Sequence, residues 1–291
     1  MIGIKMSRCA ALVACAVASG ALTMSAMPLM AQQDLGRAGT SWRWDGAVAS
    51  GGSVTMYNVN GALHFAPSSD GSVHVQAEKH VHSGGDPATV HFAVVRDGNN
   101  LVICALNGDD ATCDASGIHG GRNEGWGNDR RRNVTAEMSV QLPAGVRAVG
   151  STVNGEVTAD RIASDVKANT VNGAVRVTQV TGEVSARTVN GEVSVNTRGG
   201  TVSAETVNGS VEATMGSGGT GDMRFRTVNG SITIVGPTPL NANVELRSTN
   251  GAIDTKYPLN FDRRRRHADG VIGSGGRNLR ASTVNGSITL R

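Results

Sequence analysis

Two runs of consecutive arginines are the residues of this chain best suited to a chemical task. The runs consist of Arg130, Arg131 and Arg132, and of Arg263, Arg264, Arg265 and Arg266. A guanidinium group donates paired hydrogen bonds to carboxylate or phosphate oxygens. Both runs therefore indicate docking to an anionic polymer, such as lipopolysaccharide or an acidic glycan. A solvated loop that keeps the protein soluble would show the same pattern.

Histidines are the second group with possible chemistry, and they gather in the first third of the chain. They are His64, His74, His80, His82 and His91. His80 and His82 would share one face of a strand, as two metal ligands could. The simpler interpretation is a solvated strand surface, so we expect neither a metal nor another cofactor.

Catalytic motifs give no support for an enzyme. The sequence has no nucleophile elbow, no zinc-protease helix and no phosphate-binding loop. Acidic residues that alternate with valines are Glu156, Asp165, Glu183, Glu192 and Glu205. Such carboxylates could pair as the acids of a polysaccharide-cleaving enzyme, but no cluster of them recurs in phase. We expect a non-enzymatic protein, with a periplasmic polysaccharide-acting enzyme or accessory factor as the alternative.

The elements that carry these residues are set by an internal repeat. The unit Thr-Val-Asn-Gly, once as Ser-Thr-Asn-Gly, recurs with its asparagine at Asn154, Asn172, Asn190, Asn208, Asn229, Asn250 and Asn285. The first intervals are 18 residues, and each unit divides into two halves of nine that read apolar, polar, Gly, polar, apolar, polar, apolar. Alternation over such short stretches predicts half-buried strands.

An odd repeat of nine cannot keep its apolar face inward by alternation alone, so each half needs a corner that resets the phase. Asn-Gly pairs suit such corners. We therefore predict an all-β fold, a β-solenoid whose layers stack through parallel pairing, with valines inside and the asparagines in an amide ladder. A chain of antiparallel hairpins is the rival, but hairpins do not require a unit that returns in phase.

The N-terminus has the pattern of a signal peptide. Lys5 and Arg8 precede a long uncharged apolar stretch, and cleavage after Ala31 fits the small residue there. An uncleaved anchor and a lipoprotein lipidated at Cys15 remain alternatives. Cleavage would remove two basic and no acidic residues and leave a nearly neutral protein, which indicates no nucleic-acid partner. No later stretch is long and apolar enough to span a bilayer, so we expect no further transmembrane segment.

Two cysteines remain after the signal, Cys104 and Cys113, and they predict a disulfide that closes a short loop in an exported protein. A metal site is the weaker alternative. Residues 32–150 are predicted as a less regular β-rich region with an Arg- and Gly-rich insertion, and residues 151–291 as the solenoid. We expect the final coil to end the stack, with an open edge and no cap.

Val-Gln-Leu-Pro-Ala-Gly-Val at 140–146, the tandem Thr-Val-Asn-Gly units and the final Thr-Val-Asn-Gly-Ser-Ile-Thr-Leu resemble the bacterial adhesin-like family of exported β-strand-repeat proteins, a domain of unknown function. The resemblance covers about residues 53–291. It implies a β-solenoid-like fold and an envelope location, and it brings no catalytic motif. The long Arg-rich loops depart from the plain repeat.

These observations together predict an exported protein of the periplasm, the outer surface or the medium. Its expected partner is an anionic glycan, lipopolysaccharide or another envelope protein. A structural assembly module that docks by the open solenoid edge is a further alternative.

Overall fold

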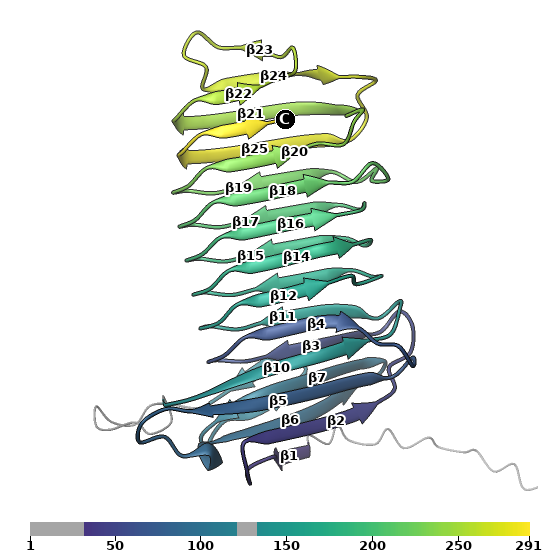
Figure 1. Ribbon diagram of the computed structural model, residues 1–291, viewed down its shortest axis with the longest axis vertical. Coiled ribbons are helices and arrows are strands. Elements are labelled where there is room, and N and C mark those ends of the chain that lie inside the picture. The colour runs from purple at the N-terminus through teal and green to yellow at the C-terminus, as the bar shows by residue number, and fades with distance from the viewer. Residues whose placement is uncertain (1–31, 121–132) are drawn as a thin grey trace, which may run out of the picture.

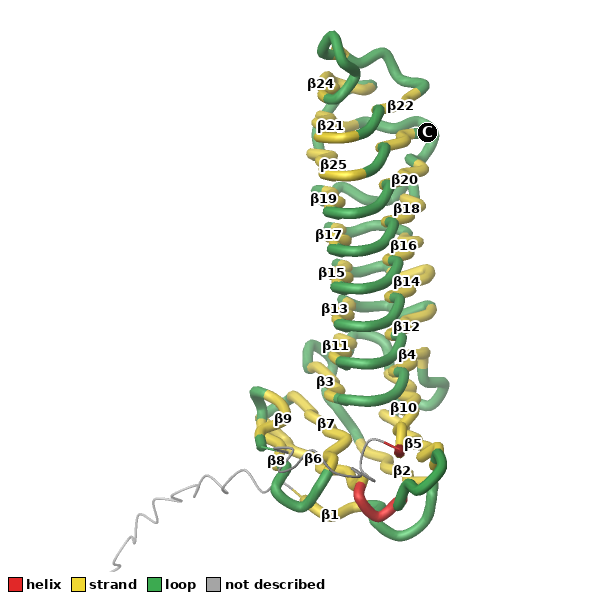
Figure 2. Tube along the Cα trace, turned by 90° about the vertical axis from the view of Figure 1, so that its left-hand side faces the viewer, coloured by secondary structure: helices red, strands yellow, loops and turns green. Residues whose placement is uncertain are grey.

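The computed structural model describes residues 32–120 and 133–291, and it shows two long β-sheets that face each other along the molecule (Figure 1). One sheet has 13 strands and is called sheet A here, and the other has 11 strands and is called sheet B. Loops join the two columns of strands layer by layer (Figure 2). The predicted all-β solenoid is confirmed.

The regular part of the solenoid consists of coils with one strand in each sheet. Sheet A receives β11 (Arg147–Ser151), β13 (Val166–Asn169), β15 (Val184–Arg187), β17 (Val202–Glu205) and β19 (Met223–Arg226). Sheet B receives β12 (Val157–Asp160), β14 (Val175–Val180), β16 (Val193–Thr197), β18 (Val211–Met215) and β20 (Ile232–Val235). Neighbouring strands are parallel and in register, so that Val175 lies opposite Val193 and Val184 opposite Val202.

The core between the sheets is a column of small aliphatic side chains. Val175, Val193 and Val211 have no exposed surface, and Ala186 and Ala204 face them from sheet A, equally buried. Side chains this small allow the two sheets to approach closely. Burying one valine stabilises a fold by about 1.5–3 kcal/mol, so the repeated stack replaces the large aromatic core of a globular domain.

The corner unit places its residues differently from our sequence interpretation. Thr188 is 5% exposed, whereas Val189 is 40% exposed, so the threonine points inward and the valine outward. The reason is a hydrogen bond between layers: Thr188 Oγ1 donates to the carbonyl of Gly173 over 2.9 Å. The same bond recurs from Thr170 to Gly155 and from Thr206 to Gly191. The half-exposed valines of the corners form a stripe along one narrow side.

The asparagines of the corners form one continuous amide ladder. From Asn154 onward, each side-chain nitrogen donates to the side-chain oxygen of the layer on its N-terminal side in the stack, over 2.8–2.9 Å. The order along the ladder is Asn60, Asn154, Asn172, Asn190, Asn208, Asn229, Asn285 and Asn250. Asn60 therefore belongs to the ladder, although it was not among the asparagines singled out in the sequence.

The N-terminal end closes the solenoid with antiparallel strands. The first coil is formed by β3 (Ser53–Tyr57) and β4 (Leu63–Pro67). The end of sheet A is built from β1 (Gln32–Leu35), β6 (Val90–Asp97) and β7 (Asn100–Asn107), and that of sheet B from β2 (Ser41–Gly46), β5 (Val73–Val81) and β10 (Val134–Leu142). Both sheets continue across residue 150, where we place a domain boundary, and that boundary stays a prediction.

Three shorter elements complete the N-terminal end. A 3-10 turn, η1 (Pro87–Thr89), links β5 to β6. Two strands, β8 (Thr112–Asp114) and β9 (Gly117–His119), form a separate small sheet. Cys104 in β7 is bonded to Cys113 in β8 with an S–S distance of 2.08 Å. This disulfide fixes the small sheet to β7, an inner strand of sheet A that lies between β6 and β3.

The C-terminal end differs from our expectation of a last coil with an open edge. Its strands are β21 (Ala242–Asn250), β22 (Ile253–Thr255), β23 (Asn260–Phe261), β24 (His267–Ile272), β25 (Asn278–Asn285) and β26 (Ile288–Leu290). The final strands do not end the stack: β25 lies between β19 and β21, and β26 lies between β20 and β22. The prediction failed because the coils β19–β20, β21–β22 and β25–β26 have the same pattern of apolar and polar residues. That pattern therefore does not determine the order in which they stack.

The solenoid also has a C-terminal cap, which the sequence analysis missed. β24 pairs antiparallel with β21, and β23 pairs with β24, so the excursion after β22 folds back over the last layer (Figure 1). The part of the chain that the structure describes contains no helix with the length and apolarity that crossing a bilayer requires. The predicted signal peptide, with Cys15 and Ala31, lies outside the described residues.

A candidate anion-binding face on sheet A

Four arginines gather on the outer face of sheet A near its C-terminal end. Arg224 and Arg226 belong to β19, Arg280 to β25 and Arg247 to β21. They point outward because they alternate with buried residues such as Phe225, which is 1% exposed. Register brings them together: Arg224 lies opposite Arg280, while Arg226 and Arg247 both lie opposite Ser282 on β25.

One carboxylate, that of Glu245, lies within this arginine cluster. Glu245 binds Arg247 at 2.5 Å and Arg280 at 3.3 Å. Among the described residues, neither Arg224 nor Arg226 forms an ion pair or a hydrogen bond through its guanidinium group, and both are exposed. Unpaired guanidinium groups side by side repel each other, so an anion that binds both would stabilise this face.

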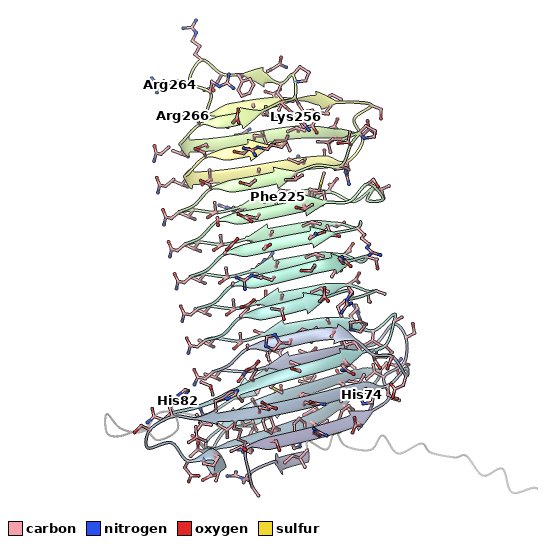
Figure 3. All side chains as sticks on the ribbon, viewed as in Figure 1. His74, His82, Phe225, Lys256, Arg264 and Arg266 are labelled. Atoms are coloured by element: carbon pink, nitrogen blue, oxygen red, sulfur yellow. A yellow bond between two sulfur atoms is a disulfide. The ribbon has the colours of Figure 1, made fainter. Side chains whose placement is uncertain are left out.

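The surface between these arginines is hollowed. A depression of about 180 Å³ is lined by Arg224, Arg226, Arg247, Arg280, Glu245 and Ser282, together with the backbone beneath them. A second one, of about 360 Å³, adjoins it at Arg247 and continues to Arg266 and His267. The basic surface therefore extends from β19 to the cap hairpin, where Figure 3 labels Arg264 and Arg266.

The predicted arginine run 263–266 lies in the turn between β23 and β24, and part of it is structural. Arg265 stacks on Phe261, with 4.2 Å between its guanidinium carbon and the ring centroid. Its carbonyl accepts from the amide of Ile253 over 3.0 Å, and its guanidinium donates to the Ile253 carbonyl. Arg265 thus covers the free edge of β22, although it is exposed like the other three arginines of the run.

Asp262 holds the turn of this run in place. Its carboxylate accepts from the backbone amides of Arg266 and His267 at 2.6 and 3.0 Å. These hydrogen bonds, that from His267 first, lower the pKa of Asp262 below its usual value. The other predicted run, Arg130 to Arg132, lies outside the described residues.

The arginines on the sheet were missed because each stands alone in the sequence. Their position within the repeat could have revealed them. Arg224 and Arg280 each follow the equivalent inward residue of their coil, Met223 and Leu279. The intercalation of β25 next to β19 was needed to bring the two together. Runs of one residue type are thus a poorer guide to a β-solenoid surface than columns of residues in equal phase.

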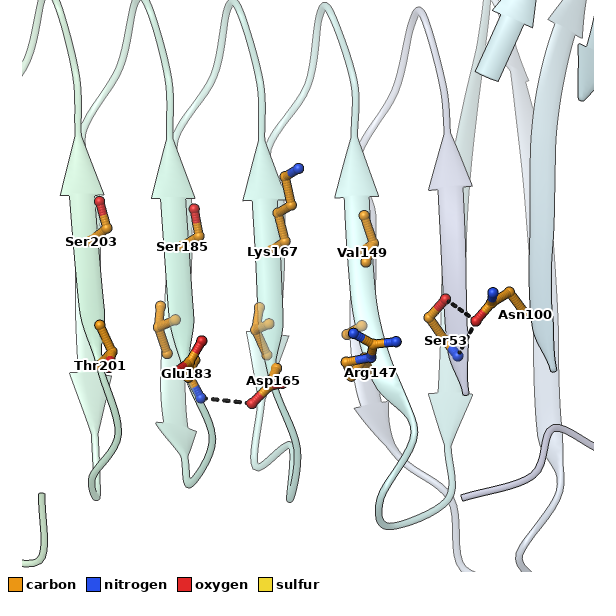
Figure 4. Close-up of a pocket in the computed structure, with 13 residues that line it drawn as sticks. Ser53, Asn100, Arg147, Val149, Asp165, Lys167, Glu183, Ser185, Thr201 and Ser203 are labelled. Atoms are coloured by element: carbon orange, nitrogen blue, oxygen red, sulfur yellow. Dashed lines mark hydrogen bonds between the residues drawn. The ribbon is translucent and has the colours of Figure 1, made fainter. Parts of the chain in front are cut away.

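Another hollow lies further toward the N-terminal end of sheet A, with a volume of about 410 Å³ (Figure 4). Arg147, Asp165, Lys167 and Glu183 project around it from β11, β13, β15 and the turns before them, and Ser185 and Ser203 lie further along. Cations and carboxylates are balanced in this hollow. The carboxylates of Asp165 and Glu183 therefore mix with cations here, whereas four arginines and one carboxylate line the hollow around Arg224.

The five histidines singled out in the sequence lie in the N-terminal part of the chain, apart from the arginine face, and three of them contact carboxylates. His64 and His80 both contact Glu137, at 3.0 and 3.3 Å. His74 bridges Asp45 and Asp70 at 2.6 and 2.9 Å. These hydrogen bonds raise the pKa of His74, and that with His74 lowers the pKa of Asp70 to about 2. Within residues 32–120 and 133–291, no group of three or more His, Cys, Asp or Glu side chains is placed to hold a metal ion.

The fold and the repeat together define a two-sheet β-solenoid protein with capped ends. The model of the Toastrack DUF4097 family matches residues 127–291, more than half of the chain, and the chain belongs to this family. The adhesin-like family of unknown function that the repeats resemble is thereby confirmed. No curated protein matches the chain.

Solved structures with detectable similarity carry names from cell adhesion. A candidate cell adhesion protein from Clostridium sporogenes is 12% identical, with a TM-score of 0.34 over 86% of this chain and 98% of that one. A candidate adhesin from Bacteroides fragilis is 13% identical, with a TM-score of 0.35 over 86% and 97%. At this level of similarity the comparison adds nothing to the residues that form the arginine face.

Proposed function

We propose that this protein is a non-enzymatic, exported adhesin-like protein of the cell envelope that binds an anionic glycan, such as the charged saccharide of lipopolysaccharide. The observation that carries the proposal is the pair Arg224 and Arg226. Both guanidinium groups are exposed and unpaired among the described residues, and they border a hollow that Arg280 and Arg247 enclose from the other side.

The arrangement suits a polymer better than a small molecule. The hollows around Arg247 are open and continuous, and they cross several strands of sheet A. Strands in a sheet lie about 4.8 Å apart, so successive layers offer donors at regular intervals along an extended chain. Exposed charges bind weakly one at a time, and a polymer that contacts several of them gains affinity by multivalency.

The proposal is tested by removing the unpaired pair. The double variant Arg224→Ser/Arg226→Ser is applied to a column that carries lipopolysaccharide, and retention is measured over a range of salt concentrations. We expect earlier elution than for the parent chain and a shallower dependence on salt, because fewer charge contacts are screened.

The matched control removes two arginines from sheet B, in the variant Arg43→Ser/Arg176→Ser. It loses the same net charge but leaves the face of sheet A unchanged, so we expect it to elute close to the parent chain. Equal loss of retention in both variants would show that only net charge matters. Unchanged retention of the Arg224/Arg226 variant would refute binding at this face.

A further inference from the structure

We propose that the C-terminal segment, residues 277–291, is an exchangeable strand donor that can fill the equivalent gap in a second copy of this chain. The basis is its position. The segment enters the solenoid between two coils that precede it in the sequence, with β25 between β19 and β21 in sheet A and β26 between β20 and β22 in sheet B. This inference is independent of the proposed glycan binding.

The gap that receives the segment is matched to it on both sides. Leu279 lies opposite Met223 on one side and Val244 on the other, and Ile288 lies opposite Ile232 and Ile253. Leu279, Ala281, Ile288 and Leu290 are at most 2% exposed. The corner adds a hydroxyl bond to each neighbour, from Thr283 to the Gly230 carbonyl and from Ser248 to the Gly286 carbonyl, beside the two ladder bonds of Asn285.

The gap can also close without the segment. Asn229 and Asn250 are 21 residues apart, as are Asn208 and Asn229, which already stack directly. Without the segment, β21 could therefore pair with β19 in the same phase, with Val244 opposite Met223. The six residues of linker 236–241 span up to about 20 Å when extended, which reaches over one layer or two. Departure of the segment thus need not leave an open core.

The connection that leads into the segment is rich in glycine, which allows a wide range of backbone conformations. Residues 273–276 read Gly-Ser-Gly-Gly, and their three glycines all have positive φ. The cap is held separately, because β24 pairs with β21 over six residue pairs from Ala242 to Arg247. The segment can therefore leave while the cap stays on β21.

The sequence pattern of the freed segment favours a second copy of this chain as its partner. Its apolar residues alternate with polar ones on both sides of a Thr-Val-Asn-Gly corner, which fits a layer with the same threonine and asparagine bonds above and below. Another copy with its own segment displaced offers that layer. Strand addition of this kind gives affinity through the main chain, and exchange of an identical element is a low-cost route to a dimer.

A mixed disulfide between two chains tests the exchange. One chain carries Thr233→Cys and the other Thr289→Cys, both in a background with Cys9→Ala and Cys15→Ala. Thr233 and Thr289 are opposite partners on the outer face of sheet B, at a spacing a disulfide can bridge. The chains are mixed, incubated below the unfolding midpoint, oxidised, and separated without reductant. A covalent heterodimer is expected, because the two cysteines of different chains meet only after exchange.

Two controls make the test decisive. In the first, Ser194→Cys on β16 replaces the Thr233 variant, on the same face but two layers away from β20, and we expect no heterodimer. In the second, one chain carries both Thr233→Cys and Thr289→Cys and is oxidised first. The segment is then locked, and we expect a monomer after incubation. The proposal is overturned if the mixture of the Thr233→Cys and Thr289→Cys chains gives no heterodimer. It is also overturned if the Ser194→Cys mixture gives as much heterodimer.

Discussion

The side chain of Asn285 donates to that of Asn229 over 2.8 Å, although 56 residues separate them. The same Asn285 accepts from Asn250, so the order of the ladder differs from the order of the sequence. The amide ladder therefore records how the coils are stacked. It also provides direct tests of the interactions that hold the solenoid together.

Replacing an asparagine inside the ladder should destabilise the fold. Asn190→Ala removes one bond donated to Asn172 and one accepted from Asn208. Each net hydrogen bond contributes roughly 0.5–1.5 kcal/mol, so a loss of about 1–3 kcal/mol in the free energy of unfolding is expected from urea titration. Asn250→Ala removes only one bond, at the end of the ladder, and should cost about half as much. Equal effects of Asn190→Ala and of Asn196→Ala, on the outer face of sheet B, would contradict this account.

A pair of neighbouring substitutions distinguishes the two orientations of the corner. Thr188→Val removes the inward hydroxyl that binds the Gly173 carbonyl and should cost about 1–3 kcal/mol, since that partly buried carbonyl loses a partner. Val189→Thr changes a side chain that is 40% exposed and should leave the unfolding free energy nearly unchanged. If Val189→Thr were the more damaging change, the valine would be the inward residue after all.

Removal of the disulfide should loosen the N-terminal end. Cys104 and Cys113 close a loop with a sequence separation of 9, and a short closed loop contributes roughly 2–3 kcal/mol by restricting the unfolded chain. The double variant Cys104→Ser/Cys113→Ser is expected to lose about this much in urea titration. Reduction of the parent chain should reproduce the loss, and a reductant without effect on its stability would argue against the bond.

The His74 cluster predicts a pH dependence of stability. Hydrogen bonds to Asp45 and Asp70 raise the pKa of His74 in the folded chain, so its contribution is present below the ordinary histidine pKa of about 6.5 and disappears as the pH rises through the raised value. That of Asp70, whose pKa is lowered to about 2, disappears as the pH falls toward that value. His74→Asn should therefore lower Tm most in mildly acidic solution. An equal decrease in Tm at pH 9 would contradict the assignment.

Much of the fold follows from the sequence because each coil repeats the same physical requirement. The strands that follow the Asn-Gly pairs, such as Val175–Val180 and Val193–Thr197, appear where the repeat predicts them, since alternation and a turn residue on each side fix them. The inward threonine was not predictable from hydrophobicity. It depends on a carbonyl of the neighbouring layer, which a pattern along the chain does not contain.

The stacking order of the last coils, and with it the arginine face, does not follow from the pattern of apolar residues. The coils that hold Asn229, Asn250 and Asn285 share the same phase, so any order satisfies the pattern of apolar residues. Only the lengths of the connections and the cap select the observed one. Arg224 and Arg280 become neighbours as a result of that order, which is why a search for runs of arginine found the hairpin turn and not the sheet.

Arginine footprinting tests the central functional claim most directly. The parent chain is treated with an arginine-specific dicarbonyl reagent, with and without soluble lipopolysaccharide saccharide, and modified sites are quantified by mass spectrometry. The account predicts protection of Arg224, Arg226, Arg247 and Arg280, with Arg43 on sheet B unchanged. Protection spread evenly over both sheets, or confined to Arg43 and its surroundings, would contradict binding at the sheet A face.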